Sequence, residues 1–339
     1  MSKRNINVLN LKNNFKTDKH INSIYKTFSS NLNFVKKNSL MIGVSGGPDS
    51  LALVALSRYF QFDKKNKVYY VLVNHKIRDN SSQEANAVKR LLKKFNISLI
   101  ILKNNQKINS NIQGKAREIR YKLFSEFCKK KKIKYILTGH HSDDQIETFL
   151  IRLSRGSGVQ GLSSMMKVSK YNKDVKIIRP LLNFKKKQLV MISQKVFGKI
   201  FIDPSNKDTK YLRTKVRRLN KMLEKSGIKN EQILKSIENL ASTNETINNY
   251  VNKIYKQCVK SNKKIVKIKY RFIKNETNEV QIKVLSKVFK EFTKSYYPPR
   301  SKKIINLLHM LNNSTQKKFT LAGCILLKEG SNLRVEREI

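Results

Sequence analysis

The first two thirds of the chain alternate short, continuously apolar runs with longer segments whose apolar residues recur at helical spacing. The apolar runs lie at residues 39–44, 68–73, 97–102, 135–138 and 175–178, and helical patterns follow the first four, at 49–62, 81–95, 112–131 and up to residue 153. Strands that are apolar on both faces are typical of a parallel sheet buried between helices. The pattern therefore predicts an α/β fold, a parallel sheet with helices on both faces.

The pattern changes around residues 203–218. Helical periodicity continues at 219–258, 279–292 and 301–311, and short strand-like pieces follow at 319–327 and 333–336. We therefore predict three parts: a polar basic leader over 1–38, an α/β domain over 39–218, and a smaller, mainly helical domain over 219–339.

The loops that follow the apolar runs carry most of the unusual residues. Three of these loops, at residues 45–50, 74–81 and 140–144, are rich in glycine, histidine and acidic side chains. Ligands of parallel α/β sheets bind at the carboxyl ends of the strands. These three loops are therefore predicted to converge on one site.

The first loop predicts a phosphate-binding turn. It consists of Ser45, Gly46, Gly47, Pro48, Asp49 and Ser50. Adjacent glycines let backbone N–H groups approach an anion, and the helix that follows adds its positive end. The lysine of a Walker A loop is missing, so hydroxyls, amides and a cation must hold the phosphates, with Asp49 as a Mg²⁺ ligand. The alternative, an ordinary capped helix start, explains a bare Ser-Gly-Gly better than it explains all six residues after a strand.

The loop at 139–148 reads Gly-His-His-Ser-Asp-Asp-Gln-Ile-Glu-Thr. Asp144 and Glu147 are three residues apart and therefore share a helical face, where they suit a Mg²⁺ ion (Asp144) or proton transfer. His140 is a candidate phosphate contact. A capped helix start with acidic first-turn residues is the simpler alternative, and a helical metal-ligand pair of the H-E-x-x-H type is missing.

The net charge of the chain predicts a nucleic-acid partner. The chain has 72 lysine and arginine residues against 23 acidic ones, a formal net charge of +49. Such a field attracts polyanions, although lysines spread over solvated faces are the alternative. The three cysteines are far apart, which excludes a C-x-x-C site and favours reduced, buried thiols. No apolar run reaches the ~18 residues of a membrane span and no apolar signal core follows the N-terminus, so a cytoplasmic protein is expected.

The Ser-Gly-Gly-x-Asp-Ser loop resembles the signature of the PP-loop (N-type) ATP pyrophosphatases, which have a Rossmann-like fold. The loop at 139–148, continued by Arg155-Gly156-Ser157-Gly158, resembles the tRNA(Ile)-lysidine synthetases within that superfamily. Segments at 75–85, 114–121 and 203–213 agree in order and spacing, so the resemblance covers 40–220, with a similar ending at 323–338. The chain looks like the shorter form of the family, which lacks an additional C-terminal domain.

Three positions depart from the pattern of the family. Asn74 and Lys76 stand where the family usually has Asp and Gly on either side of a histidine, and Thr214 stands where it commonly has Asn. Asn74 offers polar contacts without charge, so no catalytic role is assigned to it.

The resemblance implies a ligase that forms a carbon–nitrogen bond. ATP would adenylate the wobble cytidine of tRNA(Ile) with a CAU anticodon, and free L-lysine would then displace AMP to give lysidine. Asp49, Arg117 or Arg120, and Asp144 or Glu147 would carry the chemistry, and the loop at 45–50 with His140 would bind ATP and Mg²⁺. The tRNA contacts implied are Arg152, Arg155, Arg213 and Arg217, with the second domain. An exposed ion pair remains the alternative for each isolated arginine.

Other functions remain open at this point. A tRNA thiolase would use paired cysteines and an amide-forming synthetase would need a glutaminase, and neither feature is present. A catalytically inactive RNA-binding protein is disfavoured because Ser45, Asp49, Ser50, Asp144 and Glu147 are all retained. The family's members are often homodimers, but no interface pattern in the sequence supports that state.

Overall fold

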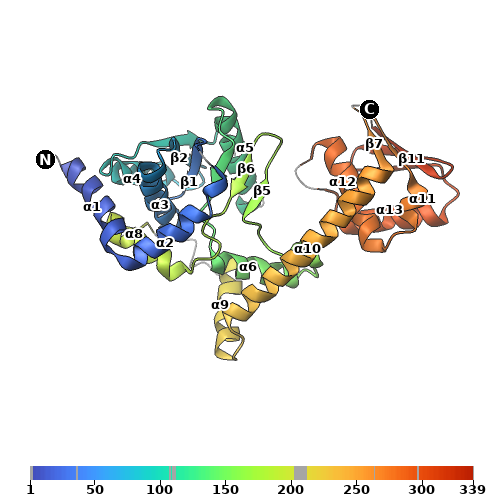
Figure 1. The fold of residues 1–339 in the computed structure, drawn as a ribbon. Helices are drawn as coiled ribbons and strands as arrows, with labels where there is room; N and C mark the ends of the chain where they lie inside the picture. Colours follow the sequence, from blue (N-terminus) through green and yellow to red (C-terminus); the bar gives the residue numbers. More distant parts are fainter. Residues whose placement is uncertain are drawn as a thin grey trace. The chain divides into compact units, whose positions relative to one another are not determined.

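The computed structural model divides the chain into two compact units, Met1–Glu238 and Asn239–Ile339 (Figure 1). The residues it describes are 3–35, 37–106, 108, 112–201, 212–262, 264–295 and 298–338. Each unit has its own hydrophobic core, so each is described by itself.

Unit 1 is built on a six-stranded sheet with strand order β3-β2-β1-β4-β6-β5. Its strands are β1 (Leu40–Val44), β2 (Val68–Asn74), β3 (Leu99–Lys103), β4 (Tyr135–Leu137), β5 (Val168–Lys170) and β6 (Lys176–Ile178). All neighbours are parallel except β5, which runs antiparallel to β6. The central β1 pairs with β2 on one side and β4 on the other, so the loops after β1 and β4 leave the sheet side by side.

Helices cover both faces of this sheet. The helices on the sheet are α3 (Pro48–Lys64), α4 (Ser81–Lys93), α5 (Ile112–Lys130) and α8 (Lys186–Phe197), and α6 (Ser142–Leu153) packs with α7 (Val159–Leu162) and α9 (Leu212–Lys225). Strand β1 shows why both faces are apolar: Leu40 and Ile42 pack in the core with α3 and α8, whereas Met41 packs with Phe124 of α5 on the other face. The α/β fold predicted for this region is confirmed, with one antiparallel edge strand that the sequence did not predict.

The predicted polar leader contains two helices, α1 (Lys3–Thr17) and α2 (Lys19–Ser30), and a 3₁₀ turn at Asn33–Val35. Several of their apolar residues, among them Phe15 and Phe28, are fully buried in the main core of unit 1. Asp18 separates the helices and caps α2 by accepting hydrogen bonds from the backbone N–H groups of His20 and Ile21. Residues 1–38 therefore contribute to the first unit in the structure rather than preceding it.

Unit 2 is not mainly helical, which corrects the expectation for the C-terminal region. It contains a five-stranded antiparallel sheet, β7-β8-β11-β10-β9. The strands are β7 (Val259–Ser261), β8 (Ile265–Ile268), β9 (Lys318–Leu321), β10 (Cys324–Glu329) and β11 (Asn332–Arg337), and the helices are α10 (Asn230–Cys258), α11 (Tyr270–Lys274), α12 (Asn278–Thr293) and α13 (Ser301–Asn313). The unit begins at Asn239, inside α10, whereas the sequence placed the boundary at residue 219.

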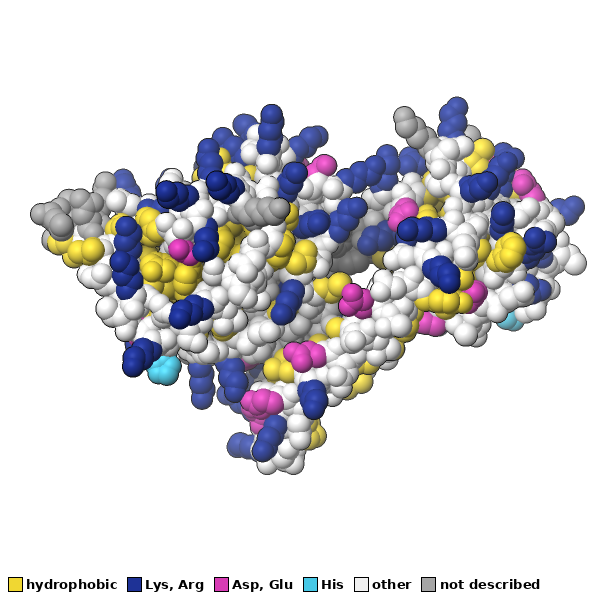
Figure 2. Space-filling model, in the orientation of Figure 1, with side chains coloured by type: hydrophobic (Ala, Val, Ile, Leu, Met, Phe, Trp, Pro, Cys, Tyr) yellow, Lys and Arg dark blue, Asp and Glu magenta, His cyan; other side chains and the backbone are white. Residues whose placement is uncertain are grey.

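The surface carries the basic charge on both units. Figure 2 shows lysine and arginine side chains scattered over both units, more of them than acidic ones. Cys128, Cys258 and Cys324 are free and buried. In the described part of the chain, no helix combines the length and the apolarity that crossing a membrane requires.

Candidate active site

The phosphate-type loop between β1 and α3 is held in shape by the side chain of Ser50. The Ser50 hydroxyl oxygen accepts hydrogen bonds from the backbone N–H groups of Ser45 (3.1 Å) and Gly46 (3.0 Å), and donates one to the carbonyl of Gly47 (2.9 Å). Gly46 has φ +91°, which a residue with a side chain rarely adopts. Gly47 caps α3 and Pro48 occupies its first turn, where the missing N–H costs nothing. The loop therefore gathers backbone N–H groups at the positive end of a helix.

The loop after β4 packs directly on this first loop. A Cβ atom added at Gly139 would lie 3.0 Å from the carbonyl oxygen of Asp49 and 3.3 Å from the backbone nitrogen of Ser50. Two loops separated by more than 80 residues thus touch through their backbones. The convergence that the parallel sheet predicted for the loops at 45–50 and 140–144 is present in the structure.

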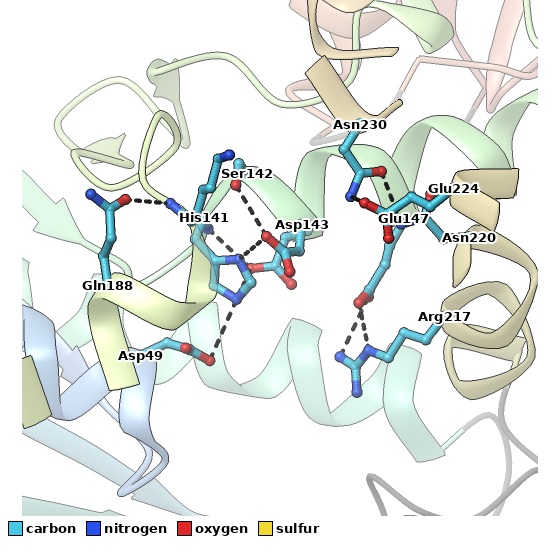
Figure 3. Close-up of polar contacts among 12 residues, drawn as sticks. Asp49, His141, Ser142, Asp143, Glu147, Gln188, Arg217, Asn220, Glu224 and Asn230 are labelled. Carbon is cyan, nitrogen blue, oxygen red and sulfur yellow. Dashed lines mark hydrogen bonds and ion pairs between the residues drawn. The ribbon is translucent and has the colours of Figure 1, made fainter. Parts of the chain in front are cut away.

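His141 lies at the centre of three carboxylates (Figure 3). Its Nε2 atom is 3.6 Å from an oxygen of Asp49 and 3.6 Å from an oxygen of Asp144, and its Nδ1 atom is 3.7 Å from Asp143. Burial lowers the pKa of His141, but the hydrogen bonds and charges of these carboxylates outweigh it and raise the pKa to about 10. Asp143, bonded to His141, has its pKa lowered to about 2. Sequence reasoning considered both histidines of this loop but assigned ATP binding to His140 alone, although the position of His141 just before Ser-Asp-Asp marks the helix start.

Burial and nearby arginines lower the pKa of two other histidines, His140 and His75. His140 forms a 2.8 Å hydrogen bond with Thr138. Burial lowers the pKa of His140, and nearby cations that include Arg117 and Arg213 lower it further. His75 has its pKa lowered to about 4 by burial and by Arg120. Among the described residues, none of these three arginines forms an ion pair with a carboxylate. The group formed by Arg117, Arg120 and Arg213 is therefore a cationic cluster suited to an anion.

Two of the predicted tRNA contacts are engaged within unit 1. Arg217 of α9 binds Glu147 of α6, with its Nε atom 2.5 Å from one carboxylate oxygen and its Nη2 atom 3.4 Å from the other. Arg152 donates hydrogen bonds to the carbonyls of Gly161 (2.6 Å) and Ser164 (2.9 Å) and so holds the loop after α6. Arg155 and Arg213 are exposed. Residues 203–208 and 211 of the family-like segment lie outside the described residues.

Asp49 and Asp144 fit a divalent cation. One oxygen of Asp49 is buried without a hydrogen-bond partner and is available to a cation, whereas its other oxygen and one oxygen of Asp144 already lie 3.6 Å from Nε2 of His141. Mg²⁺ in nucleotide sites is held by one or two carboxylates together with phosphate oxygens and water.

The residues that depart from the family pattern have structural roles. Asn74 is buried, donates to the Ser82 hydroxyl (3.0 Å) and accepts from the backbone N–H of Lys76 (3.0 Å). Thr214 is buried on α9. Lys76 has a left-handed backbone, with φ +53°, at the position where the family usually has glycine.

Replacing Lys76 with glycine is expected to stabilise unit 1 relative to Lys76→Ala. Both variants lose the same exposed charge, but only glycine adopts φ +53° without a clash between Cβ and the backbone, a difference of about 1 kcal/mol. Denaturant unfolding of the two variants measures the difference in the free energy of unfolding. Equal stabilities would contradict a strained backbone at this position.

Comparisons with known proteins agree with this geometry. The family model of the PP-loop domain matches residues 16–226. The tRNA(Ile)-lysidine synthase of Wolbachia pipientis is 35% identical over 308 residues, which cover 89% of this chain and 71% of that protein. The enzyme of the same name from Rickettsia bellii is 30% identical over 326 residues, covering 93% and 74%. Among solved structures, a U34-tRNA thiolase from Methanococcus maripaludis aligns with a TM-score of 0.56 at 21% identity over 66% of this chain and 79% of its own, a likeness of fold.

Proposed function

The chain belongs to the tRNA(Ile)-lysidine synthase family of PP-loop proteins, and we propose that it ligates free L-lysine to carbon 2 of the wobble cytidine of CAU-anticodon tRNA(Ile). The observation that carries the proposal is the contact between two loops far apart in sequence. That contact brings Asp49 and Asp144 to within 3.6 Å of one histidine nitrogen, beside a turn of backbone N–H groups. A site of this kind can hold the phosphates of ATP next to carboxylates that manage protons or a cation.

The first step is adenylation of the tRNA. The oxygen on carbon 2 of the cytosine attacks the α-phosphate of ATP, and pyrophosphate leaves. The N–H groups of Ser45 and Gly46 are taken by the Ser50 hydroxyl, so the phosphates bind at the N-terminus of α3 that follows. The cationic cluster of Arg117, Arg120 and Arg213 offsets negative charge that develops on them. Mg²⁺ held by Asp49 and Asp144 would polarise the phosphate oxygens.

The second step is attack by lysine. An amine of lysine bonds to carbon 2, and AMP leaves with the oxygen that was adenylated. Only a neutral amine attacks, so the ammonium must first bind and lose a proton. Asp144 and Glu147, on the same face of α6, supply the negative region for that binding.

The outer face of the sheet in unit 2 is the surface that we assign to tRNA phosphates. Lys260, Lys267, Arg334, Leu327 and Lys318 form one row across all five strands. Neighbouring strands are about 4.8 Å apart, so the like charges of Lys260, Lys267 and Arg334 face one another, which is unfavourable without a counterion. Arg334 is bonded to Glu336, whereas the three lysines have no carboxylate partner among the described residues. A phosphate backbone would supply the missing charge.

Replacing Lys260, Lys267 and Lys318 together with glutamine is expected to weaken tRNA binding and to reduce its salt dependence. Three phosphate contacts lower the slope of log K against log salt by about 2–3. The control is the triple glutamine variant at Lys253, Lys256 and Lys302, exposed lysines on α10 and α13. Filter binding over a range of salt concentrations measures both slopes. An equal loss in the two variants would show a general charge effect and contradict a specific surface.

Sulfur transfer is less well supported. The likeness to a tRNA thiolase is one of fold. The iron–sulfur cluster bound by that thiolase would need accessible cysteines that lie close together. Cys128 lies in unit 1, the other two lie in unit 2, and all three are buried.

The proposed function is tested with ATP labelled in its α-phosphate. Purified protein is incubated with Mg²⁺, L-lysine and CAU-anticodon tRNA(Ile), and each component is omitted in turn. AMP formation that requires both tRNA and lysine, with labelled lysine entering the tRNA, is the expected result. A tRNA adenylate that never accepts lysine would leave the first step standing and reject lysine as the nucleophile. ATP that remains unchanged in every mixture would reject the enzyme.

A further inference from the structure

The segment between α7 and β5 is held in place by side chains of α6 and by the residue that follows β6. Gln145 of α6 donates a hydrogen bond to the carbonyl of Met165 (2.9 Å) and accepts one from its backbone N–H (2.7 Å). Arg179, just after β6, donates to the carbonyl of Met166 (2.9 Å). Residues 163–166 are therefore fixed by two separate elements of unit 1.

The backbone of Ser164 is strained within this segment. Its φ is +56°, in the left-handed region that favours glycine. Its carbonyl accepts a hydrogen bond from Arg152 (2.9 Å), and its hydroxyl donates one to the carbonyl of Gln145 (3.2 Å). Strain that surrounding contacts maintain is characteristic of segments that must present a group in one place.

The group that this segment presents is the side chain of Met166. Its exposed fraction is 60%, although its backbone and those of the two residues before it are hydrogen-bonded. A single exposed methionine is ordinary on a protein surface. Met166 differs from an ordinary one because its segment is rigid and because of where that segment lies.

Met166 lies at the edge of the sheet that carries the candidate active site. Val168, the first residue of β5, pairs with Ile178, the last residue of β6 (Figure 1). The carbonyl of Ile178 accepts a hydrogen bond from the backbone N–H of Thr138 (3.0 Å), two residues before His140. The segment just before β5 is therefore at the same edge as the loop after β4.

Cations accompany this apolar side chain. Lys167, the next residue, is exposed. Burial lowers the pKa of His140 most, and Arg179 is among the cations that lower it further, so the guanidinium that binds the Met166 carbonyl lies near that histidine. An apolar contact among cations suits a nucleobase with its phosphates. It does not suit a second copy of this chain, whose net charge is +49.

The proposed reaction needs such a contact. An enzyme that modifies a base must take that base out of its stack, and it recovers part of the cost by stacking the base on aromatic or apolar side chains. The polarizable thioether of methionine makes favourable contacts with aromatic rings. We propose that Met166 is the surface on which the extruded wobble cytosine stacks while its oxygen on carbon 2 is adenylated. The inference rests on the proposed function and adds a base contact to it.

Single-turnover adenylation of CAU-anticodon tRNA(Ile) at saturating ATP tests the assignment. In Met166→Ser the rate at saturating tRNA is expected to fall about tenfold, the scale of losing one base stack. The Kd for tRNA is expected to change by less than about twofold, because phosphate contacts dominate affinity. Met166→Phe, which offers a larger stacking surface, is expected to keep the rate. The matched control is Met222→Ser, at a methionine of α9 that is 67% exposed, and it is expected to react like the wild type.

A rate within about twofold of the wild type in Met166→Ser would overturn the proposal. Equal losses in Met166→Ser and Met166→Phe would also overturn it, because a base stacks on phenylalanine at least as well as on methionine. An equal loss in Met222→Ser, or a lower stability of Met166→Ser in denaturant unfolding, would assign the effect to the surface or the fold in general. Failure of the proposed function is distinguishable, because the wild type itself would then form no tRNA adenylate.

Discussion

Replacing Asp49 with asparagine is expected to lower the rate of ATP-dependent AMP formation by about a thousandfold. Asparagine is nearly isosteric, so the turn held by Ser50 should keep its hydrogen bonds. The variant loses the charge of a carboxylate that faces Asp144 and has one buried oxygen without a partner. A neutral amide cannot hold a cation against phosphate oxygens as a carboxylate does.

Single-turnover assays at saturating ATP, with ATP affinity measured separately, check this prediction. Asp143→Asn is the matched comparison, because Asp143 also contacts His141 but is more exposed than Asp49. We expect less than about a tenfold effect there, since that carboxylate contacts Ser142 and His141 and its side chain is 45% exposed. Similar losses in both variants would assign the effect to His141 and reject a cation site at Asp49.

The fold of unit 1 was predictable because its strands are apolar on both faces. The run predicted at 68–73 is β2, Val68–Asn74, and the strand predicted at 135–138 is β4, Tyr135–Leu137. The helices of the leader were not predicted, since lysine and asparagine dilute their apolar residues. Phe15 and Phe28 become buried only against α3 and its neighbours, a contact that no local pattern contains.

The sheet of unit 2 was also only partly predictable, because its strands pair with partners far away in the sequence. Strand β8 is four residues long and contains Lys267, so its alternation is too short and too basic to stand out. It forms because Leu333 to Glu336 of β11, more than 60 residues later, supply the partner strand. The sequence predicted the late strands but not the earlier ones that complete the sheet.

The candidate site was predictable to the level of loops but not of side-chain partners. The pairing of β1 with both β2 and β4 makes the loops that follow them neighbours, which topology alone requires. The pairing of Glu147 with Arg217 joins residues 70 positions apart and depends on where α9 lies. The sequence could therefore name both residues as functional without showing that each is the other's partner.

Replacing Gly46 with alanine is expected to damage both folding and ATP binding, whereas Gly47→Ala should damage ATP binding alone. At Gly46 the backbone is left-handed, and a Cβ atom would lie 2.7 Å from the Cγ2 atom of Val88 on α4. Backbone strain and the clash together should cost about 2–3 kcal/mol of the free energy of unfolding. At Gly47, φ is −66° and the nearest neighbour of an added Cβ is 3.8 Å away, so stability should change by less than about 0.5 kcal/mol.

Substitutions at the two glycines therefore distinguish the folding of the turn from its binding of phosphate. If phosphate approaches the backbone at Gly47 closely, a methyl group there should weaken ATP binding by about tenfold or more, although the protein remains as stable as the wild type. Denaturant unfolding and calorimetric titration with ATP measure the two effects on the same samples. Normal ATP affinity in Gly47→Ala would mean that the phosphates lie elsewhere, and normal stability in Gly46→Ala would mean that the turn relaxes away from Val88. The predicted combination, one variant unstable and the other stable but weak in binding ATP, requires phosphate to sit on the backbone of this turn.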